Sequence, residues 1–258
     1  MSTNKDAILL RINKEDQVKA LRELGFTNVS NDMPLSEIAE HIKWAGGLRD
    51  LRITCVKLSD KSIVYFTETE WNALSANAMS LYRKIGVCIR ARKREFIFAA
   101  EDCKTATGGT GFKYGAYGKD LVGVKNYAGG NVGLHEINTG YEDTVASIEQ
   151  TAGYTDSQGT TGAPAAEAAF NYKANEDDPL QWYLPSITEL MLLCEFKTEI
   201  NSFLTKNFNG GTITTENYWS STEYNSSLSW YVGMLSGYSY INHRYGTNRV
   251  RPVAVVAK

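Results

Sequence analysis

The sequence predicts an α+β protein in which strands come before and after the main helical segment. Three observations support this fold class: alternating β-branched segments in the first hundred or so residues, a capped apolar helix after residue 185, and further strands near the end of the chain. The 258 residues, 43% of them apolar, suffice for one large domain or two small ones. No internal repeat is apparent, and this order of elements favours α+β.

The first 82 residues are expected to form two short helices and a hairpin. A polar cap, an acidic first turn and a closing glycine indicate a helix over 13–25, and a second helix runs from Pro34 to the glycine pair before residue 48. The β-branched segments 52–58 and 62–68 then alternate around a short polar turn, which predicts a β-hairpin. By its position, this region could attach a larger domain to an assembly.

The middle of the chain is expected to be mostly irregular after two strands. The strands are predicted at 85–91 and 95–101, and a glycine-rich run with aromatic residues follows from 108 to 130. Irregular structure is expected to continue to about Asp178. Loops of that length in a compact domain are usually functional or held down by the domain's own side chains.

The helical segment after residue 185 has a strong start signal. Ser186 and Glu189 have the spacing of a capping box, and an apolar stripe continues from there until Gly210 ends the helix. The tail returns to strands and finishes with RVRPVAVV. Because Pro252 lacks a backbone N–H, this last strand is expected at a sheet edge or with a bulge.

Charge and hydropathy exclude several classes of partner and location. A net charge of −2 and a pI near 6 give no basic field for nucleic-acid binding. The N-terminus lacks the apolar core of a secretory signal, and no run approaches the roughly 20 apolar residues of a membrane span. We therefore expect synthesis in a cytoplasm, no membrane insertion and four free cysteines. The basic run 90–94 fits a solvated turn, with an anionic surface partner as the alternative.

The motifs that would indicate a cofactor, a metal or catalysis fail on inspection. A phosphate-binding loop would need Gly at Lys113 and Ser or Thr at Asp120, and the dinucleotide fingerprint would need Gly at Tyr114. His135 begins a zinc-protease pattern, but Thr139 stands where its second histidine should be. The sequence therefore predicts no cofactor, no metal and no catalytic residue, and turn glycines in the glycine-rich run.

The segment from Tyr224 to Asn248 has an unusual composition. Its 25 residues include five Tyr, five Ser and three Asn, and Arg244 is its one charged residue. Along a strand, Leu228, Trp230, Val232 and Met234 would share one face, so the face carrying Ser227, Ser229, Tyr231 and Gly233 would point the other way. Tyr, Ser and Asn are enriched in recognition loops, but tyrosine also favours ordinary hairpins. Composition alone leaves both interpretations open.

Four motifs in order carry a resemblance to a known family. WYLPSITEL (182–190), YWSSTEY (218–224), SWYVGML (229–235) and RVRPV (249–253) resemble the C-type-lectin-like domains of the DUF1566 type. That group is similar in fold to formylglycine-generating enzymes and to the variable proteins of diversity-generating retroelements, including phage major tropism determinant. The resemblance implies a lectin-like ligand-binding domain over 83–258, after an attachment region over 1–82.

The resemblance also implies a variable-type region at about 219–253. In the retroelement-diversified members, substitutions arising at template adenines lie on a ligand-binding face, and this window is rich in the residues that such changes produce. The positions expected to contact ligand are Tyr224, Asn225, Ser227, Ser229, Tyr231, Ser236, Tyr238, Tyr240, Asn242, His243, Arg244 and Tyr245. The positions expected to form the scaffold beneath them are Trp219, Trp230, Val232 and Met234.

Two departures from the wider family narrow the expected function. The calcium-binding motifs of carbohydrate-binding lectins are missing, and the cysteines show no redox pair of the kind that formylglycine-generating enzymes use. The expected function is therefore non-enzymatic binding of a protein or glycan receptor on a bacterial surface, as the diversified protein of a phage or prophage tail. Such a protein would be part of a virion and contact other tail proteins, and by resemblance it could be a homotrimer. The alternatives are a surface or fimbrial adhesin with a fixed lectin-like domain, and a formylglycine-generating-like oxidase.

Overall fold

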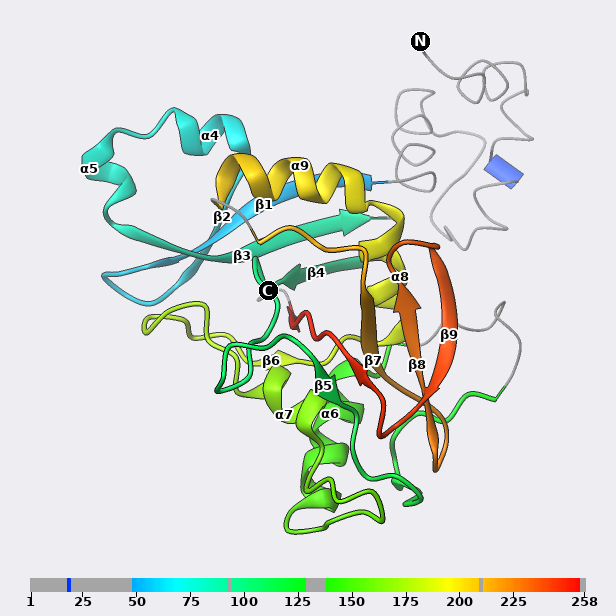
Figure 1. Cartoon of the computed structure of the whole chain (residues 1–258). Coiled ribbons are helices and arrows are strands. Elements are labelled where there is room, and N and C mark those ends of the chain that lie inside the picture. Colours follow the sequence, from blue (N-terminus) through cyan, green and yellow to red (C-terminus); the bar gives the residue numbers. More distant parts are fainter. Residues whose placement is uncertain (1–17, 20–47, 92–93, 129–137, 209–210, 256–258) are drawn as a thin grey trace. The chain divides into compact units, whose positions relative to one another are not determined.

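The computed structural model describes residues 18–19, 48–91, 94–128, 138–208 and 211–255 (Figure 1). The chain divides into two compact units, one of residues 1–50 with 89–94 and the other of residues 51–88 with 95–258. The helices expected near residues 13 and 34 lie outside the described residues, apart from Val18 and Lys19, which are helical.

The predicted α+β class is confirmed. A six-stranded sheet has the strand order β2-β1-β3-β4-β11-β6, and a three-stranded sheet has the order β7-β8-β9. The strands of the larger sheet are β1 (Leu48–Lys57), β2 (Ile63–Phe66), β3 (Tyr82–Ala91), β4 (Arg94–Phe98), β6 (Trp182–Tyr183) and β11 (Val253–Val255). The described residues also form α4 (Glu68–Asn72), α5 (Ala76–Met79), α6 (Gly140–Thr151), α7 (Pro164–Phe170), α8 (Ile187–Glu195) and α9 (Lys197–Asn207).

The N-terminal hairpin and the two strands after it form as predicted. β1 and β2 pair antiparallel, with Ile53 opposite Phe66 and Val56 opposite Ile63. β1 is also the neighbour of β3, so the hairpin belongs to the same sheet as the strands that begin the lectin-like resemblance. A domain boundary near residue 82 stays a prediction.

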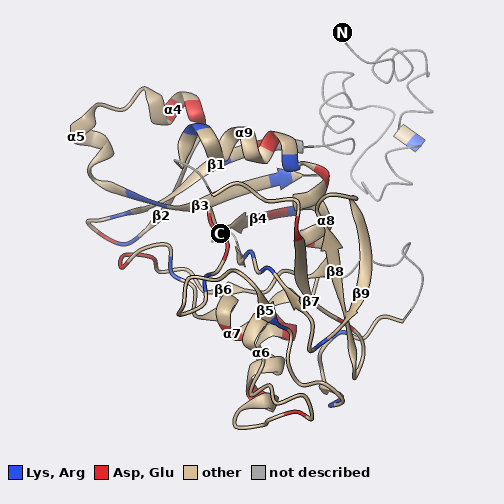
Figure 2. Cartoon of the chain, in the orientation of Figure 1, with Lys and Arg blue, Asp and Glu red and all other residues tan. Residues whose placement is uncertain are grey.

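The tail forms the smaller sheet, in which β7 (Asn217–Asn225), β8 (Leu228–Gly233) and β9 (Tyr238–His243) are antiparallel neighbours. A further pair joins β5 (Phe112–Lys113) to β10 (Thr247–Asn248). Charged residues mark α4, α9 and β1, whereas β8 and β9 are almost entirely uncoloured (Figure 2). The sheet made by the tail is thus nearly free of charge.

The capping box predicted at Ser186 is present, but the helix it starts is interrupted. The Ser186 side chain accepts from the Glu189 N–H, and Glu189 Oε2 accepts from the Ser186 N–H at 2.8 Å. The helix was expected to run on to Gly210. Instead α8 ends at Glu195, because Phe196 has a φ of −104° and a ψ of 21° that leave helical geometry, and α9 begins at Lys197.

The prediction of irregular structure up to Asp178 is wrong for α6 and α7. The buried residues of α6 are Gly, Asp, Thr and Ser, whereas Val145 and Ile148, which have helical spacing, are only partly buried. The hydroxyls of Thr144, Ser147 and Thr151 each donate to the carbonyl four residues earlier, at 2.6, 2.7 and 2.7 Å. α7 buries only alanines, starting after Pro164.

The last strand was expected at a sheet edge or with a bulge at Pro252, and the structure shows neither in β11 (Val253–Val255). β11 pairs antiparallel with β4 on one side and with β6 on the other, so it is internal. Pro252 lies immediately before β11, where its missing N–H removes no bond of the strand, and its carbonyl accepts from Ala99 N–H at 2.9 Å.

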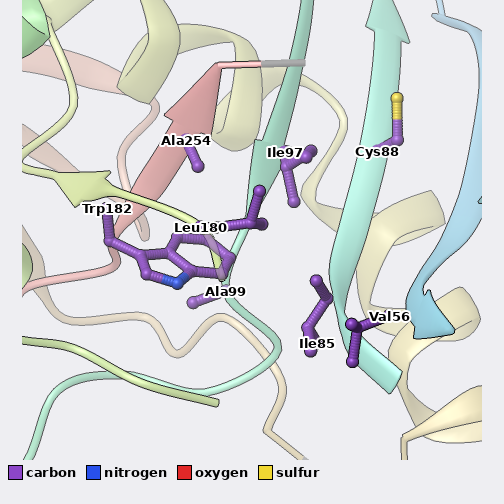
Figure 3. Close-up of a cluster of buried hydrophobic side chains, with 8 residues drawn as sticks. All are labelled: Val56, Ile85, Cys88, Ile97, Ala99, Leu180, Trp182 and Ala254. Atoms are coloured by element: carbon purple, nitrogen blue, oxygen red, sulfur yellow. The ribbon is translucent and has the colours of Figure 1, made fainter. Parts of the chain in front are cut away.

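A core cluster lies on the six-stranded sheet around Trp182 (Figure 3). The Trp182 ring is fully buried, and its Nε1 donates to Asp178 Oδ2 at 2.7 Å. A Cβ on Gly86 of β3 would lie 3.0 Å from the Trp182 ring and 2.7 Å from the carbonyl oxygen of Phe98, so this position requires glycine. The members are Val56, Ile85, Cys88, Ile97, Ala99, Leu180, Trp182 and Ala254.

Among the described residues, no helix is both long and apolar enough to cross a membrane.

A buried carboxylate joins the two sheets. Asp102, just after β4, lies 2.7 Å from Arg251 Nε and accepts from Tyr218 Oη at 2.9 Å and from Arg249 at 3.1 Å. Arg251 is 1% exposed and also donates to the carbonyls of Ala99 and Gly211. Both arginines of the RVRPV motif thus anchor the tail to the larger sheet.

Replacement of Asp102 by Ala is expected to lower the free energy of unfolding by about 3–5 kcal/mol, because it leaves a buried guanidinium uncompensated. Glu101→Gln is the matched control, since the Glu101–Lys104 pair is more than half exposed at both ends and should change stability by less than about 1 kcal/mol. Urea titration of both variants measures the difference. Equal effects would contradict the role assigned to Asp102.

Candidate functional site

Three tyrosines of the tail lie on one face of the β8–β9 hairpin. Tyr231 is paired directly with Tyr240, and Tyr238 is two residues from Tyr240 on the same strand. The ring centroids of Tyr231 and Tyr240 are 5.6 Å apart, and those of Tyr238 and Tyr240 are 6.4 Å apart. We call these three residues the tyrosine face.

The tyrosine face is anchored in the core at one end and open at the other. Tyr231 contacts the fully buried Trp219 ring of β7, with centroids 6.1 Å apart. Exposure then rises along the row: Tyr231 is partly buried, Tyr240 is 42% exposed and Tyr238 is 64% exposed. A Cβ on Gly233 would lie 2.9 Å from Ser236 Oγ but at an ordinary contact distance of 3.5 Å from the Tyr240 ring. The outer rings are therefore both supported and accessible.

A second aromatic cluster forms at the far end of β9. His243 and Tyr245 are stacked with ring centroids 4.9 Å apart, and both contact Tyr117, at 6.1 and 5.0 Å. Tyr117 comes from the glycine-rich run and lies between Gly115 and Gly118, whose φ angles are 93° and 83°. Those turns confirm the predicted role of the glycines. Sequence reasoning missed Tyr117 because its contact with the tail is not local.

Other predicted contact positions are used within the tail itself. Asn225 Oδ1 accepts from the N–H groups of Ser227 and Leu228, both at 2.9 Å, and closes the turn between β7 and β8. Ser236 Oγ donates to Gly233 and accepts from Tyr238 in the next turn. Asn242 Oδ1 accepts from the His243 N–H at 2.8 Å, and Tyr224 packs on Trp230. Asn225, Ser236 and His243 are exposed, and Tyr224, Ser227 and Asn242 are partly buried.

The predicted scaffold positions are buried. Trp219, Trp230, Val232 and Met234 are at most 5% exposed, and α8 packs against β7 and β8. The Trp230 Nε1 donates to the Tyr127 carbonyl at 2.8 Å. The inward face inferred from alternation is therefore confirmed for Trp230, Val232 and Met234. Trp219 pairs with Tyr231 and lies on the other face, where the Tyr114 ring packs against it.

Ser229 and Arg244 need correction, because both side chains are fully buried and cannot contact a ligand at the surface. Alternation placed Ser229 opposite the core, but the loop after β5 covers that side: the buried Tyr114 ring lies against Trp219 on it. Arg244 forms an ion pair with Glu223, with Nη2 and Oε1 2.6 Å apart and both side chains 0% exposed. The exposed part of the segment from Tyr224 to Asn248 therefore carries no formal charge.

Nε of Arg244 has no hydrogen-bond partner among the described residues, whereas its Nη1 and Nη2 donate to backbone carbonyls. They reach the Lys119 carbonyl at 3.0 Å and the Asn225 carbonyl at 2.5 Å, and the guanidinium lies 5.2 Å from the Tyr114 ring centroid. Burial raises the pKa of Glu223, while Arg244 acts in the opposite direction. Arg244 thus links the end of β9 to β7 and to the loop that carries Tyr117.

A second buried carboxylate holds the neighbouring loop against β7. Asp143 accepts from Lys125 N–H at 2.8 Å and from Thr139 Oγ1 at 2.7 Å, with Ser221 Oγ at 3.4 Å. Burial raises its pKa to about 6, although these hydrogen bonds lower it. The Asp143 contacts therefore join the start of α6 and the segment around Lys125 to Ser221 of β7.

The described residues offer little for metal or thiol chemistry. No group of three or more His, Cys, Asp or Glu side chains among them could hold a metal ion. Cys55, Cys88 and Cys103 are buried, and burial raises the pKa of Cys55 and Cys103 to about 12, which keeps both thiols protonated at neutral pH.

Residues 141–254 match the family model described as the Lcl C-terminal domain. This domain is related to the DUF1566 type that the sequence resembles, and the match supports a ligand- or receptor-binding type of protein for this part of the chain. It extends from α6 to β11 and includes the whole β7–β9 sheet.

A fimbrial protein from Bacteroides ovatus is similar in structure, with a TM-score of 0.46 and 15% sequence identity over 63% of this chain. The match spans 36% of that protein's chain, so this chain corresponds to about a third of its length. No curated protein matches the sequence.

Arg244→Ala is expected to lower the free energy of unfolding by about 3–5 kcal/mol, because Glu223 would remain buried without its partner. The neighbouring His243→Ala is the control and should change stability by less than about 0.5 kcal/mol, since His243 is exposed. Chemical denaturation measures both. If Arg244→Ala unfolds at the same denaturant concentration as the wild type, the structural role assigned to Arg244 is wrong and the residue is available for ligand contact.

Proposed function

We propose that the β7–β9 sheet binds a protein or glycan receptor through the tyrosine face, without catalysis. The observation that carries this proposal is an exposed, uncharged row of tyrosines that rests on the buried Trp219. Tyrosine offers a large contact area at low cost in conformational entropy, and buried aromatic anchors dominate many interfaces. The match to the Lcl C-terminal domain supports the same type of function.

Replacement of Tyr238 and Tyr240 by Ala should abolish capture of ligand while leaving thermal unfolding nearly unchanged, because Tyr238 is 64% and Tyr240 42% exposed and neither belongs to the buried core. Each lost anchor is expected to cost about 2 kcal/mol, so the double variant should bind at least ~100-fold more weakly. An array of bacterial surface glycans and purified surface proteins serves as the probe.

Tyr141→Ala is the matched control, because Tyr141 is 40% exposed and lies on α6, outside the sheet. Binding should also be insensitive to NaCl between about 0.05 and 0.5 M, since no exposed charge contributes. Retained capture by the double variant, or equal loss in Tyr141→Ala, would show that the tyrosine face is not the site.

The finer proposal is that this is the diversified variable protein of a retroelement, active in host recognition by a phage or prophage tail and located in the virion. The exposed positions of β9 support it, because their side chains can change without disturbing the core. In such a particle, other tail proteins would be partners, and many copies would raise the avidity of a weak site by roughly 10²–10⁴.

The DNA within a few kilobases of the gene tests diversification. A reverse-transcriptase gene is expected, together with a near-copy of the segment encoding about residues 219–253 that differs only where the copy has adenine. The differences should fall at exposed positions such as Tyr238 and Tyr240 and spare buried Arg244. A locus with neither gene nor near-copy would reject diversification and leave receptor binding untouched.

A fixed surface adhesin is the second candidate. Burial of Ser229 and Arg244 favours it, because two positions that the diversification pattern includes are structural and could not vary freely. The two candidates share the tyrosine face as the binding surface and differ in whether the sequence of that face changes between related cells or particles.

A further inference from the structure

The two edge strands of the three-stranded sheet, β7 and β9, differ in whether other segments pair with their outer side. The outer edge of β7 is covered by parallel bridges from Asn126 to Glu223 and from Arg249 to Tyr218. β9 is the other outer strand, and no strand of the described chain pairs with its far side. Within the described part of the chain, one edge of the sheet is therefore closed and the other is open.

Pairing with β8 determines which backbone groups of β9 point outward. The Arg244 N–H donates to the Ser227 carbonyl at 3.0 Å, so in this antiparallel register Tyr240 and Asn242 also direct their N–H and C=O groups toward β8. The groups of Ser239, Ile241 and His243 then point away from it.

The outward groups of His243 are already used. Its N–H donates to Asn242 Oδ1 and its carbonyl accepts from Gly246 N–H, both at 2.8 Å. The N–H and C=O of Ser239 and Ile241 make no hydrogen bond within the described part of the chain. The open edge thus presents two donors and two acceptors and ends at His243.

This edge also lacks the usual protection against pairing. Natural edge strands are commonly blocked by a charged side chain, a proline or a bulge. β9 reads YSYINH, pairs with β8 without interruption and has neither charge nor proline. Tyr238, Tyr240 and Ile241 are exposed on its two faces.

We propose that the open edge of β9 pairs antiparallel with β9 of a second copy of this chain, about a two-fold axis at Tyr240. In this register Ser239 lies opposite Ile241 of the second copy, and Ile241 lies opposite its Ser239. Each pair exchanges two hydrogen bonds, so the pairing satisfies all the outward groups that are free in both copies.

The second copy is favoured over an unrelated strand because the edge is complementary to itself. Tyr240 would face Tyr240 of the second copy in a close, non-hydrogen-bonded pair, and Tyr238 would face its Asn242, with no charges opposed. The two three-stranded sheets would become one continuous sheet. Because residues that lie opposite each other share a face, the tyrosine faces of both copies would be on the same side of it. The dimer does not depend on whether the tyrosine face binds a receptor.

Sedimentation velocity at about 1–100 μM tests the association. The sedimentation coefficient of the wild-type chain should approach that of a dimer as the concentration rises. Ser239→Pro should raise the Kd of the dimer at least ~10-fold, so that the variant sediments mainly as a monomer. Proline at position 239 removes the outward N–H of that residue in each copy but no hydrogen bond to β8. Proline is also tolerated on edge strands. Ile241→Lys, which adds a charge beside the axis, should have the same effect. Leu235→Lys is the control, because Leu235 is 79% exposed in the turn outside the paired segment.

Cysteine cross-linking tests the register. Under mild oxidation, Tyr240→Cys should form a disulfide-linked dimer, because the two positions meet at the axis, whereas Tyr238→Cys, which faces Asn242, should not. The wild-type chain controls for its own cysteines. A monomer at every concentration, a trimer, a dimer retained by folded Ser239→Pro and Ile241→Lys, or equal cross-linking at both positions would overturn the proposal.

Discussion

The buried ion pair between Glu223 and Arg244 is the interaction on which the tail depends. Arg244 follows the last strand of the β8–β9 hairpin, and Glu223 lies in the irregular part of β7. Arg244 also donates to the Lys119 carbonyl, which attaches the loop after β5 to both strands. Removing two charges from water is costly, and the cost is offset only when geometry and further hydrogen bonds are good. Here the guanidinium also reaches the Asn225 carbonyl and lies over Tyr114, so three segments share one fixed arrangement.

The same ion pair explains why the exposed tail is neutral. Arg244, the one charged residue of the segment from Tyr224 to Asn248, is buried. The exposed surface of this segment consists mainly of tyrosine, serine and asparagine with a few aliphatic side chains. Binding at this surface, as proposed, would rely on contact area and short polar groups rather than on long-range attraction. The row from Trp219 to Tyr238 passes from rigid core to solvent, so the outer rings are held in place before any partner arrives.

Buried and exposed side chains are divided between the strands of the smaller sheet. β7 and β8 hold buried side chains, and the Asp102 cluster ties Tyr218 and both arginines of the closing motif to the larger sheet. β9 contributes little to the core, and most of its side chains are exposed. A change at Tyr238 alters the surface, whereas a change at Ser229 or Arg244 alters the fold.

Local patterns in the sequence were enough to predict the α+β class, the first hairpin, the capping box at Ser186 and the inward face of Trp230 and Val232, because each depends on neighbours along the chain. Only the tertiary structure placed Tyr117 beside His243 and buried Ser229 and Arg244. Alternation separates two faces of a strand but does not say what covers the second face. That depends on loops distant in sequence, and here the segment around Tyr114 closes over one end of the face and leaves the tyrosines at the other end open.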